Sequence, residues 1–156
     1  MDEALLQRLV TLEGESAVRR LMARYMDLCD VPRAVTHVSE LARLFTVDAI
    51  WEGVGSVTAQ TFGQHQGREA VAAFVGGYLP PSEHFRLNLH YLTSESIVVD
   101  GGTAKGQWIM QQISTYADGR SELFGTRLNI DFRCVDGSWL IAHFRTQRLF
   151  NMELSA

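Results

Sequence analysis

Asp30 and His90 are the two residues whose types and surroundings could together supply a general base. Asp30 closes a helical stretch, where the partial negative charge of the helix C-terminus disfavours a carboxylate by about 0.3 to 1 kcal/mol. His90 lies in an apolar, strand-like stretch, so its ring must reach solvent or find a partner. A carboxylate bonded to one ring nitrogen would fix the tautomer and leave the other nitrogen as the base. Taken singly, each residue also has an ordinary structural explanation. Asp30 could be a solvated acid, and His90 could be a structural residue whose ring makes hydrogen bonds inside the protein.

Arg148 and Tyr25 are further polar candidates among apolar neighbours. Arg148 stands beside Leu149 and Phe150, where a guanidinium needs an acceptor unless it reaches solvent. Tyr25 lies on the apolar side of a helical stretch and could present its hydroxyl to the interior or be a plain core residue. Aromatic residues are also numerous, and they either fill the core or line an apolar cavity. They include Trp51, Phe62, Phe85, Trp108, Tyr116, Phe124 and Phe144.

Composition and motif content exclude several classes of function. The 156 residues, 46% hydrophobic and 21% charged, are typical of one globular domain, which we place over residues 1–156. A net charge of −4 without a block of like charge gives no support for nucleic acid or an anionic membrane as a partner. No apolar run approaches the roughly 20 residues of a membrane span, and the first 12 residues lack the pattern of a signal peptide. We therefore expect a cytoplasmic protein.

Cysteine and histidine usage indicates chemistry without a metal or cofactor. Two cysteines, Cys29 and Cys134, cannot form a disulfide framework and are expected to be small core residues. The five histidines lack the spacing of metal ligands, and the sequence contains no phosphate-binding loop, zinc motif or nucleophile elbow.

Helices are expected in the first half of the chain. Apolar residues recur there at intervals of three and four, which is typical of amphipathic helices. The predicted helices cover residues 16–30, 39–45 and 67–79. A strand is expected to begin at Ala49 and to break at the glycines and serines of residues 53–56.

The second half has the pattern of a long antiparallel meander. Asp-Gly pairs recur every 18 residues, and the segments between them are rich in β-branched and aromatic residues. These turns fall at residues 100–101, 118–119 and 136–137. The four strands would reach about 50 Å at about 3.3 Å per residue, so the sheet must bulge and curl around the helices. The alternation of residue types does not by itself decide whether the set Trp108, Met110, Gln112 and Tyr116 faces inward.

The chain resembles the SnoaL-like branch of the nuclear transport factor 2-like superfamily, which includes scytalone dehydratase, bile-acid dehydratase and a hexachlorocyclohexane dehydrochlorinase. The resemblance spans nearly the whole chain, and the order of its motifs is more specific than any one of them. They are residues 18–25 (VRRLMARY) followed by Asp30, 44–52 (LFTVDAIWE), 67–71 (GREAV), His90 and 137–143 (GSWLIAH).

This resemblance implies an α+β cone in which three helices pack inside a strongly bent antiparallel sheet around a deep apolar pocket. By analogy, Asp30 orients His90, and His90 removes a proton from the substrate. Tyr25 matches a helix-borne tyrosine of the family and Arg148 a C-terminal strand arginine, both as catalytic groups. Gln112 stands where the bile-acid enzyme has an acid, and a glutamine cannot serve as an ionised base.

The resemblance also favours the arrangement in which Trp108, Met110, Gln112 and Tyr116 face inward together with His90. This arrangement would require an irregularity of the strand pairing near Gly101-Gly102. The residues expected to bind substrate are then Trp51, Trp108, Met110, Gln112, Tyr116 and Phe144.

The leading hypothesis is a cofactor-free lyase of the dehydratase type, or an isomerase, that acts on a small apolar substrate of aromatic, polycyclic or steroid-like shape. Two alternatives stay open because widely shared folds host many functions. The first is a non-catalytic hydrophobic-ligand binder or a structural subunit like those of ring-hydroxylating dioxygenases. The second is a polyketide-type cyclase. A homodimer or higher homo-oligomer, formed through the outer face of the sheet, is also expected.

Overall fold

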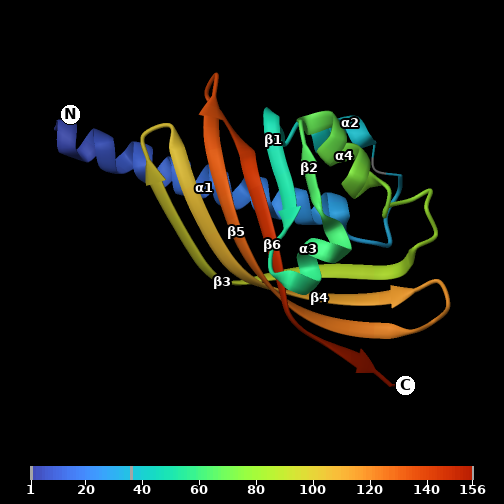
Figure 1. Cartoon of the computed structure of the whole chain (residues 1–156). Coiled ribbons are helices and arrows are strands. Elements are labelled where there is room, and N and C mark those ends of the chain that lie inside the picture. Colours follow the sequence, from blue (N-terminus) through green and yellow to red (C-terminus); the bar gives the residue numbers. More distant parts are fainter. Residues whose placement is uncertain (1, 36, 156) are drawn as a thin grey trace.

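The computed structural model describes residues 2–35 and 37–155 and has a mixed α+β architecture. A long, curved sheet bends around the C-terminal half of one long helix, and three short helices lie near one end of the sheet (Figure 1). The helices are α1 (Glu3–Cys29), α2 (Val38–Ala42), α3 (Ser56–Phe62) and α4 (Arg68–Gly76). The strands are β1 (Phe45–Gly53), β2 (Gln64–Gln66), β3 (Phe85–Asp100), β4 (Thr103–Tyr116), β5 (Ser121–Val135) and β6 (Ser138–Leu154). The predicted fold class is confirmed.

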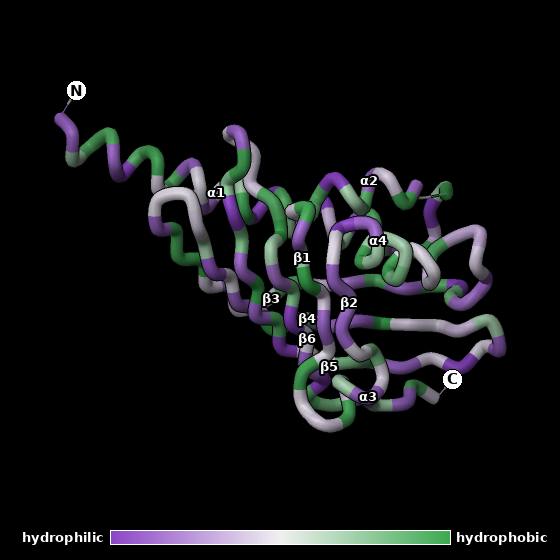
Figure 2. The backbone as a smooth tube through the Cα atoms, turned by 45° about the horizontal axis from the view of Figure 1, so that its top comes forward, coloured by the Kyte–Doolittle hydropathy of each residue, from purple (hydrophilic) through white to green (hydrophobic). Residues whose placement is uncertain are grey.

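The sheet has six strands in the order β2-β1-β6-β5-β4-β3. The last four strands form the predicted meander, with 14 to 17 residues each, and all their pairings are antiparallel. Strand β1 extends this sheet by pairing in parallel with β6, and β2 pairs antiparallel with β1. The strands alternate between hydrophobic and hydrophilic residues, as expected for a sheet with one covered face (Figure 2).

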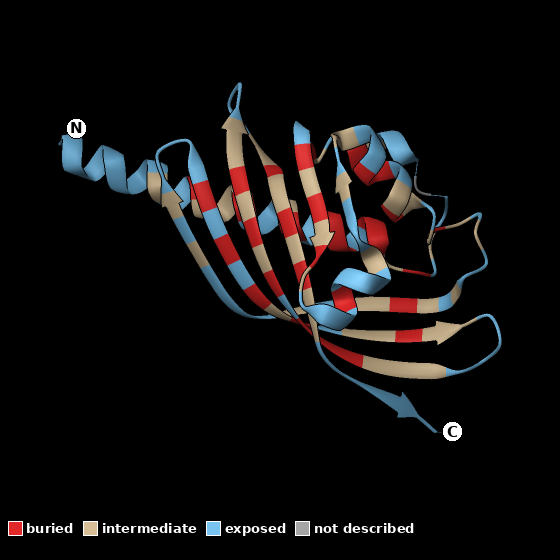
Figure 3. Ribbon diagram, viewed as in Figure 1, coloured by how far each residue is buried: buried red, intermediate tan, exposed pale blue. Residues whose placement is uncertain are grey.

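Helix α1 is longer than its periodicity predicted. It begins at Glu3, and Asp2 caps it by accepting a hydrogen bond from the Ala4 N–H. Its N-terminal half projects beyond the sheet and is exposed, whereas the half nearer Cys29 has one buried face (Figure 3). The helix ends one residue before Asp30, whose backbone is extended, so the carboxylate follows directly on the buried end of α1.

Two elements of the first half were not predicted, and two were misplaced. Helix α3 begins at Ser56, the last residue of the expected break at residues 53–56, and β2 follows it. Strand β1 begins at Phe45, four residues before the expected Ala49, so α2 is only five residues long. The described part of the chain therefore has four helices where three were expected.

The irregularity that sets the facing of the strands lies at Ser94 and not at Gly101-Gly102. Asp100 pairs with Thr103, so the two glycines form a regular two-residue hairpin turn. The register shifts between Thr93 and Ser96, where Ser94 adopts a positive φ of 52°. An extra residue in one strand reverses the facing of everything beyond it. His90 is thereby paired with Gln112 and shares its face of the sheet.

The core lies between α1 and the concave face of the sheet. It includes fully buried residues of α1, β5 and β6, such as Met22, Leu128 and Ile141. None of the helices within residues 2–35 and 37–155 is both long and apolar enough to cross a membrane. Across the same residues, no group of three or more His, Cys, Asp or Glu side chains is placed to hold a metal ion.

Candidate functional site

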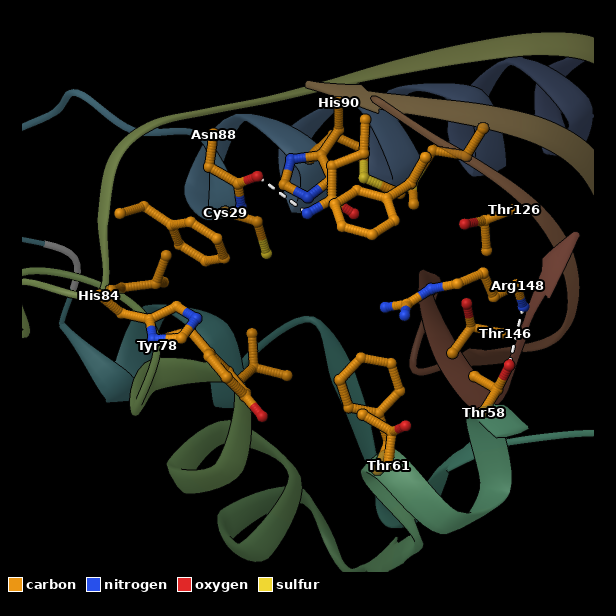
Figure 4. A pocket seen from close by; sticks show the side chains of 18 of the residues that line it. Cys29, Thr58, Thr61, Tyr78, His84, Asn88, His90, Thr126, Thr146 and Arg148 are labelled. Carbon is orange, nitrogen blue, oxygen red and sulfur yellow. Dashed lines mark hydrogen bonds between the residues drawn. The ribbon is translucent and has the colours of Figure 1, made fainter. Parts of the chain in front are cut away.

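A cavity of about 430 Å³ lies between the concave face of the sheet and the helices α1, α3 and α4 (Figure 4). Its walls are largely aromatic and aliphatic, and its polar groups are few. Among the described residues that line it, none is an aspartate or a glutamate, whereas two are arginines and two are histidines. Exposed His84 and Arg120 belong to the lining, which places the opening beside them. A volume in this range suits a small organic molecule.

The His90 ring lines this cavity and is bonded to Asp30. Nδ1 of His90 lies 2.8 Å from Oδ1 of Asp30, and the same oxygen accepts the backbone N–H of His90 at 3.0 Å. The His90 side chain is 9% exposed and that of Asp30 is 32% exposed. A carboxylate can only accept here, so Nδ1 carries the proton and Nε2 has the free lone pair. No other described residue bonds to that nitrogen.

A short bridge between backbones brings the two residues together. Val31 and Asn88 exchange two hydrogen bonds of 2.8 Å, which tie the chain just after α1 to β3. Asp30 is next to Val31, and His90 is two residues beyond Asn88 on the same face of β3. The bridge thereby holds Asp30, at the end of α1, next to the His90 ring.

Three polar side chains form a bonded group beside His90. Oδ1 of Asn88 accepts hydrogen bonds of 2.8 Å from both Gln112 and Ser114, and the Gln112 amide also donates to Ser114 at 3.2 Å. Asn88 and Gln112 line the cavity. Sequence reasoning missed Asn88 and Ser114, although each lies two residues from a selected residue, a spacing that places both on the inner face.

Tyr25 and Cys29 belong to the apolar wall on α1. The Tyr25 hydroxyl accepts a hydrogen bond of 3.1 Å from the indole N–H of Trp51, which stacks on Phe144 with ring centroids 5.4 Å apart. Burial raises the pKa of Tyr25 well above its usual value and that of Cys29 to about 12. Both groups are therefore uncharged at neutral pH, and Tyr25 keeps a hydroxyl proton that it can donate.

Arg148 enters the cavity from β6. Its backbone N–H donates to the hydroxyl of Thr58 on α3 at 2.9 Å, and its guanidinium carbon lies 4.6 Å from the centre of the Phe124 ring. The side chain reaches toward the middle of the open space (Figure 4). No ion pair joins it to any carboxylate in the part of the chain that the structure describes.

Comparison with known families supplies the identity of the fold. The SnoaL-like domain family matches residues 10–145. The chain belongs to this family. A comparison with curated proteins gave no match.

Solved structures of the nuclear transport factor 2-like superfamily share the fold of this SnoaL-like chain. A hexachlorocyclohexane dehydrochlorinase, LinA type 2, superposes with a TM-score of 0.76 at 18% identity, over 93% of this chain and 91% of the other. A candidate scytalone dehydratase from Novosphingobium aromaticivorans has a TM-score of 0.76 at 20% identity, over 93% and 90%. An NTF2-like protein from the same species has a TM-score of 0.71 at 22% identity, over 96% and 92%. At these identities the likeness establishes the fold alone.

Most of the site residues selected from the sequence of this SnoaL-like chain meet at the cavity. Asp30 contacts His90 there, and the lining includes Tyr25, Trp51, His90, Met110, Gln112, Tyr116, Phe144 and Arg148. Trp108 is the exception, because it is buried outside the cavity. Its ring packs against Phe132, and its indole N–H donates to Glu95 at 3.3 Å. The Tyr116 hydroxyl donates to Glu122 at 2.7 Å, and burial together with that carboxylate raises its pKa to about 12.

Proposed function

We propose that this chain is a cofactor-free lyase or isomerase that removes a proton from a small, largely apolar substrate. The observation that carries the proposal is the 2.8 Å contact between Nδ1 of His90 and Oδ1 of Asp30 at the wall of an apolar cavity. The contact supplies a base with a fixed tautomer, and the cavity supplies a site that a hydrophobic molecule can enter.

In the proposed reaction, Nε2 of His90 accepts a proton from a carbon of the substrate. The electron pair of that C–H bond forms a new double bond, and the leaving group departs with its own bonding pair. In a dehydration, the hydroxide takes up a proton and leaves as water. In an isomerisation, His90 returns the proton to a different carbon. Electrons stay on the substrate throughout, so the sequence of steps needs no oxidant or reductant.

The polar residues of the cavity suit the charges that develop in these steps. The Asp30 carboxylate stabilises the imidazolium that His90 becomes. Tyr25 can donate a hydrogen bond to an oxyanion or a leaving group, because it remains protonated. Arg148 can donate to a negatively charged group of the substrate, because it has no carboxylate partner among the described residues. Aromatic walls exclude water around them, which strengthens each of these interactions.

Replacing His90 tests the proposed base. Wild-type protein and His90→Gln are incubated with hydroxylated aromatics, hydroxysteroids and chlorinated cyclohexanes, and loss of water or hydrogen chloride is followed by mass spectrometry. We expect the substitution to reduce turnover by about 10²- to 10⁴-fold. His143→Gln is a matched control, because His143 also contacts a carboxylate, Glu52, at 2.7 Å but lies outside this cavity. Undiminished turnover by His90→Gln would contradict the assignment.

Asp30 is a positioning residue in this scheme, since it acts through His90. Asp30→Asn should lower kcat with little change in KM. In a protein that already carries His90→Gln, the same substitution should have no further effect on kcat, because the two side chains work as a unit. Independent, multiplicative losses would show that Asp30 contributes only to folding.

Ligand binding without turnover is the alternative function, and the comparison of the wild type with His90→Gln distinguishes it from catalysis. An apolar cavity of this size would also suit a protein that only stores or carries a hydrophobic molecule. In that case, probes bind equally well to the wild type and to His90→Gln, and none is converted by either.

A further inference from the structure

We propose that Arg148, together with the hydroxyls of Thr58, Thr126 and Thr146, forms a subsite for a carboxylate group of the ligand. The inference narrows the substrate class of the proposed function to ring-bearing acids. Only its link to turnover rests on that function, because carboxylate binding itself does not require His90 to act as a base.

The first observation is an arginine without a counter-ion in a cavity that contains no acid. Arg148 is partly buried, and stacking on Phe124 at 4.6 Å restrains its side chain while leaving the edge of the guanidinium free. Glu122, on the face of β5 that also carries Phe124, instead accepts hydrogen bonds from Tyr116 and Asn151. The guanidinium is therefore free to bind an acceptor from a ligand, and a planar carboxylate matches its fork of donors.

The second observation is a pair of unbonded threonine hydroxyls at the same place. Thr126 and Thr146 are each only 6% exposed and both line the cavity. Within residues 2–35 and 37–155, their hydroxyls have no hydrogen-bond partner. With no partner among the described residues, the two hydroxyls are free to bond a polar part of a ligand in the cavity that they line.

Strand pairing and α3 gather these groups around one point. Thr126 of β5 is the direct partner of Arg148 on β6, and Thr146 precedes Arg148 by two residues on the same face. Thr58 of α3 accepts the backbone N–H of Arg148 through its hydroxyl oxygen, so the hydroxyl hydrogen remains available to donate. Figure 4 shows the three threonines around the base of the Arg148 side chain and the guanidinium extending into the open space.

The rest of the cavity determines what the carboxylate is attached to. Most of the remaining lining of the cavity is aromatic or aliphatic, with Trp51, Phe144 and Met110 among it. The ligand that fits is a hydrocarbon ring system with one carboxylate, held so that the ring lies against His90.

A pair of matched probes tests the subsite by binding alone. 2-Naphthoate and its neutral isostere 2-naphthamide are titrated into the protein, and binding is followed by calorimetry and by the fluorescence of the cavity residue Trp51. We expect the wild type to prefer the acid by about 10- to 100-fold, as for a hydrogen-bonded charged group. Equal affinity for the two probes would overturn the proposal.

Substitutions then assign the preference to named residues. Arg148→Gln should remove the preference for the acid and leave the affinity for the amide within about threefold. Thr126→Val and Thr146→Val keep the shape of the side chain, and each should weaken binding of the acid alone, which gives a readout that does not depend on how well Arg148→Gln folds. Arg145→Gln is the control, because Arg145 is ion-paired with Asp131 at 2.9 Å and does not line this cavity. Unchanged preference in Arg148→Gln and both threonine variants would overturn the proposal.

Two further measurements separate the carboxylate subsite from the catalytic role of His90 and from a halide site at Arg148. His90→Gln should retain the preference for the acid even if all turnover is lost, so failure of the catalytic assignment and failure of the subsite give different results. Displacement of 2-naphthoate by millimolar chloride would assign the Arg148 site to a halide leaving group and would overturn the carboxylate assignment.

Discussion

At the scale of single residues, one oxygen of Asp30 determines the state of the His90 ring. Oδ1 accepts both the ring Nδ1–H and the backbone N–H of His90, so the carboxylate is fixed relative to the strand as well as to the ring. The ring itself is nearly buried, whereas the carboxylate keeps contact with water.

The two cysteines should differ sharply in reactivity. Burial raises the pKa of Cys29 to about 12, so at pH 8 only about one Cys29 side chain in 10⁴ is a thiolate, the form that reacts. Cys134 is partly exposed. With iodoacetamide at pH 8, we expect mass spectrometry to find Cys134 alkylated while Cys29 remains a free thiol until the protein is unfolded in guanidinium. Labelling of Cys29 in the folded protein at the rate of Cys134 would contradict this expectation.

The residues of the site differ in how visible they are in the sequence. Asp30, His90 and Arg148 stand out because charged or titratable groups are unusual beside apolar neighbours. Thr126 and Thr146 do not, since threonine is an ordinary residue of a strand and carries no local signal of a binding role. Their significance depends on which face of the sheet they occupy, and the pairing of β5 with β6 decides that.

At the scale of elements, the bulge at Ser94 determines which residues of β3 and β4 face the cavity. Ser94 adopts a φ of 52°, a conformation that costs most side chains about 1 kcal/mol or more but suits glycine. We expect Ser94→Gly to keep or slightly raise the free energy of unfolding and Ser94→Val to lower it by about 1 to 2 kcal/mol, both measured by urea denaturation. The opposite order would show that the bulge is not under conformational strain.

A companion measurement separates strain from a general loss of packing. Ser96→Val alters the next serine along β3, beyond the left-handed position, and should change the free energy of unfolding by less than Ser94→Val does. Equal effects at both sites would indicate that valine is unfavourable anywhere on this stretch.

The elements predicted correctly from the sequence are those with a strong local signal. The Asp-Gly turns located three hairpins, and Pro32 indicated where α1 ends. Helix α3 has seven residues and β2 has three, and both are flanked by glycines that read as a break. Contacts distant along the chain stabilise them, such as the hydrogen bond of 3.0 Å from the Gly53 N–H to the Gly63 carbonyl. The bulge was misplaced because two adjacent glycines gave a stronger local signal than Ser94.

At the scale of the whole molecule, the cavity remains open because α1 and α4 pack against different parts of the sheet. Helix α1 packs against β3 and β6, and α4 packs against β1. The long strands curve and continue beyond the end of α1 (Figure 1). There the inner face of the sheet lies opposite α3 and α4, and the cavity lies between them. Aromatic residues line the space that remains, and it opens to solvent at one end.

The outer face of the same sheet carries an apolar row that we expect to be covered by a second copy of the chain. Ile113, Leu123 and Met152 are direct partners across three adjacent strands, on the face opposite Gln112 and the cavity. Phe150 and Leu154 flank this row, and they and Met152 are 40% to 56% exposed. Exposed apolar patches of this kind are typical of interfaces, and such a face can pair with its own copy about a twofold axis.

Light scattering tests this expectation directly. A chain of 17.5 kDa should give about twice that mass, or a higher multiple, at micromolar concentration. Met152→Glu places a charge in the middle of the apolar row, where desolvating it would cost several kcal/mol, so the variant should have the mass of a monomer. Val47→Glu, at a residue of β1 that is 72% exposed, is the matched control and should leave the mass unchanged. A wild-type mass of 17.5 kDa would show that the row is solvent-exposed in the isolated protein.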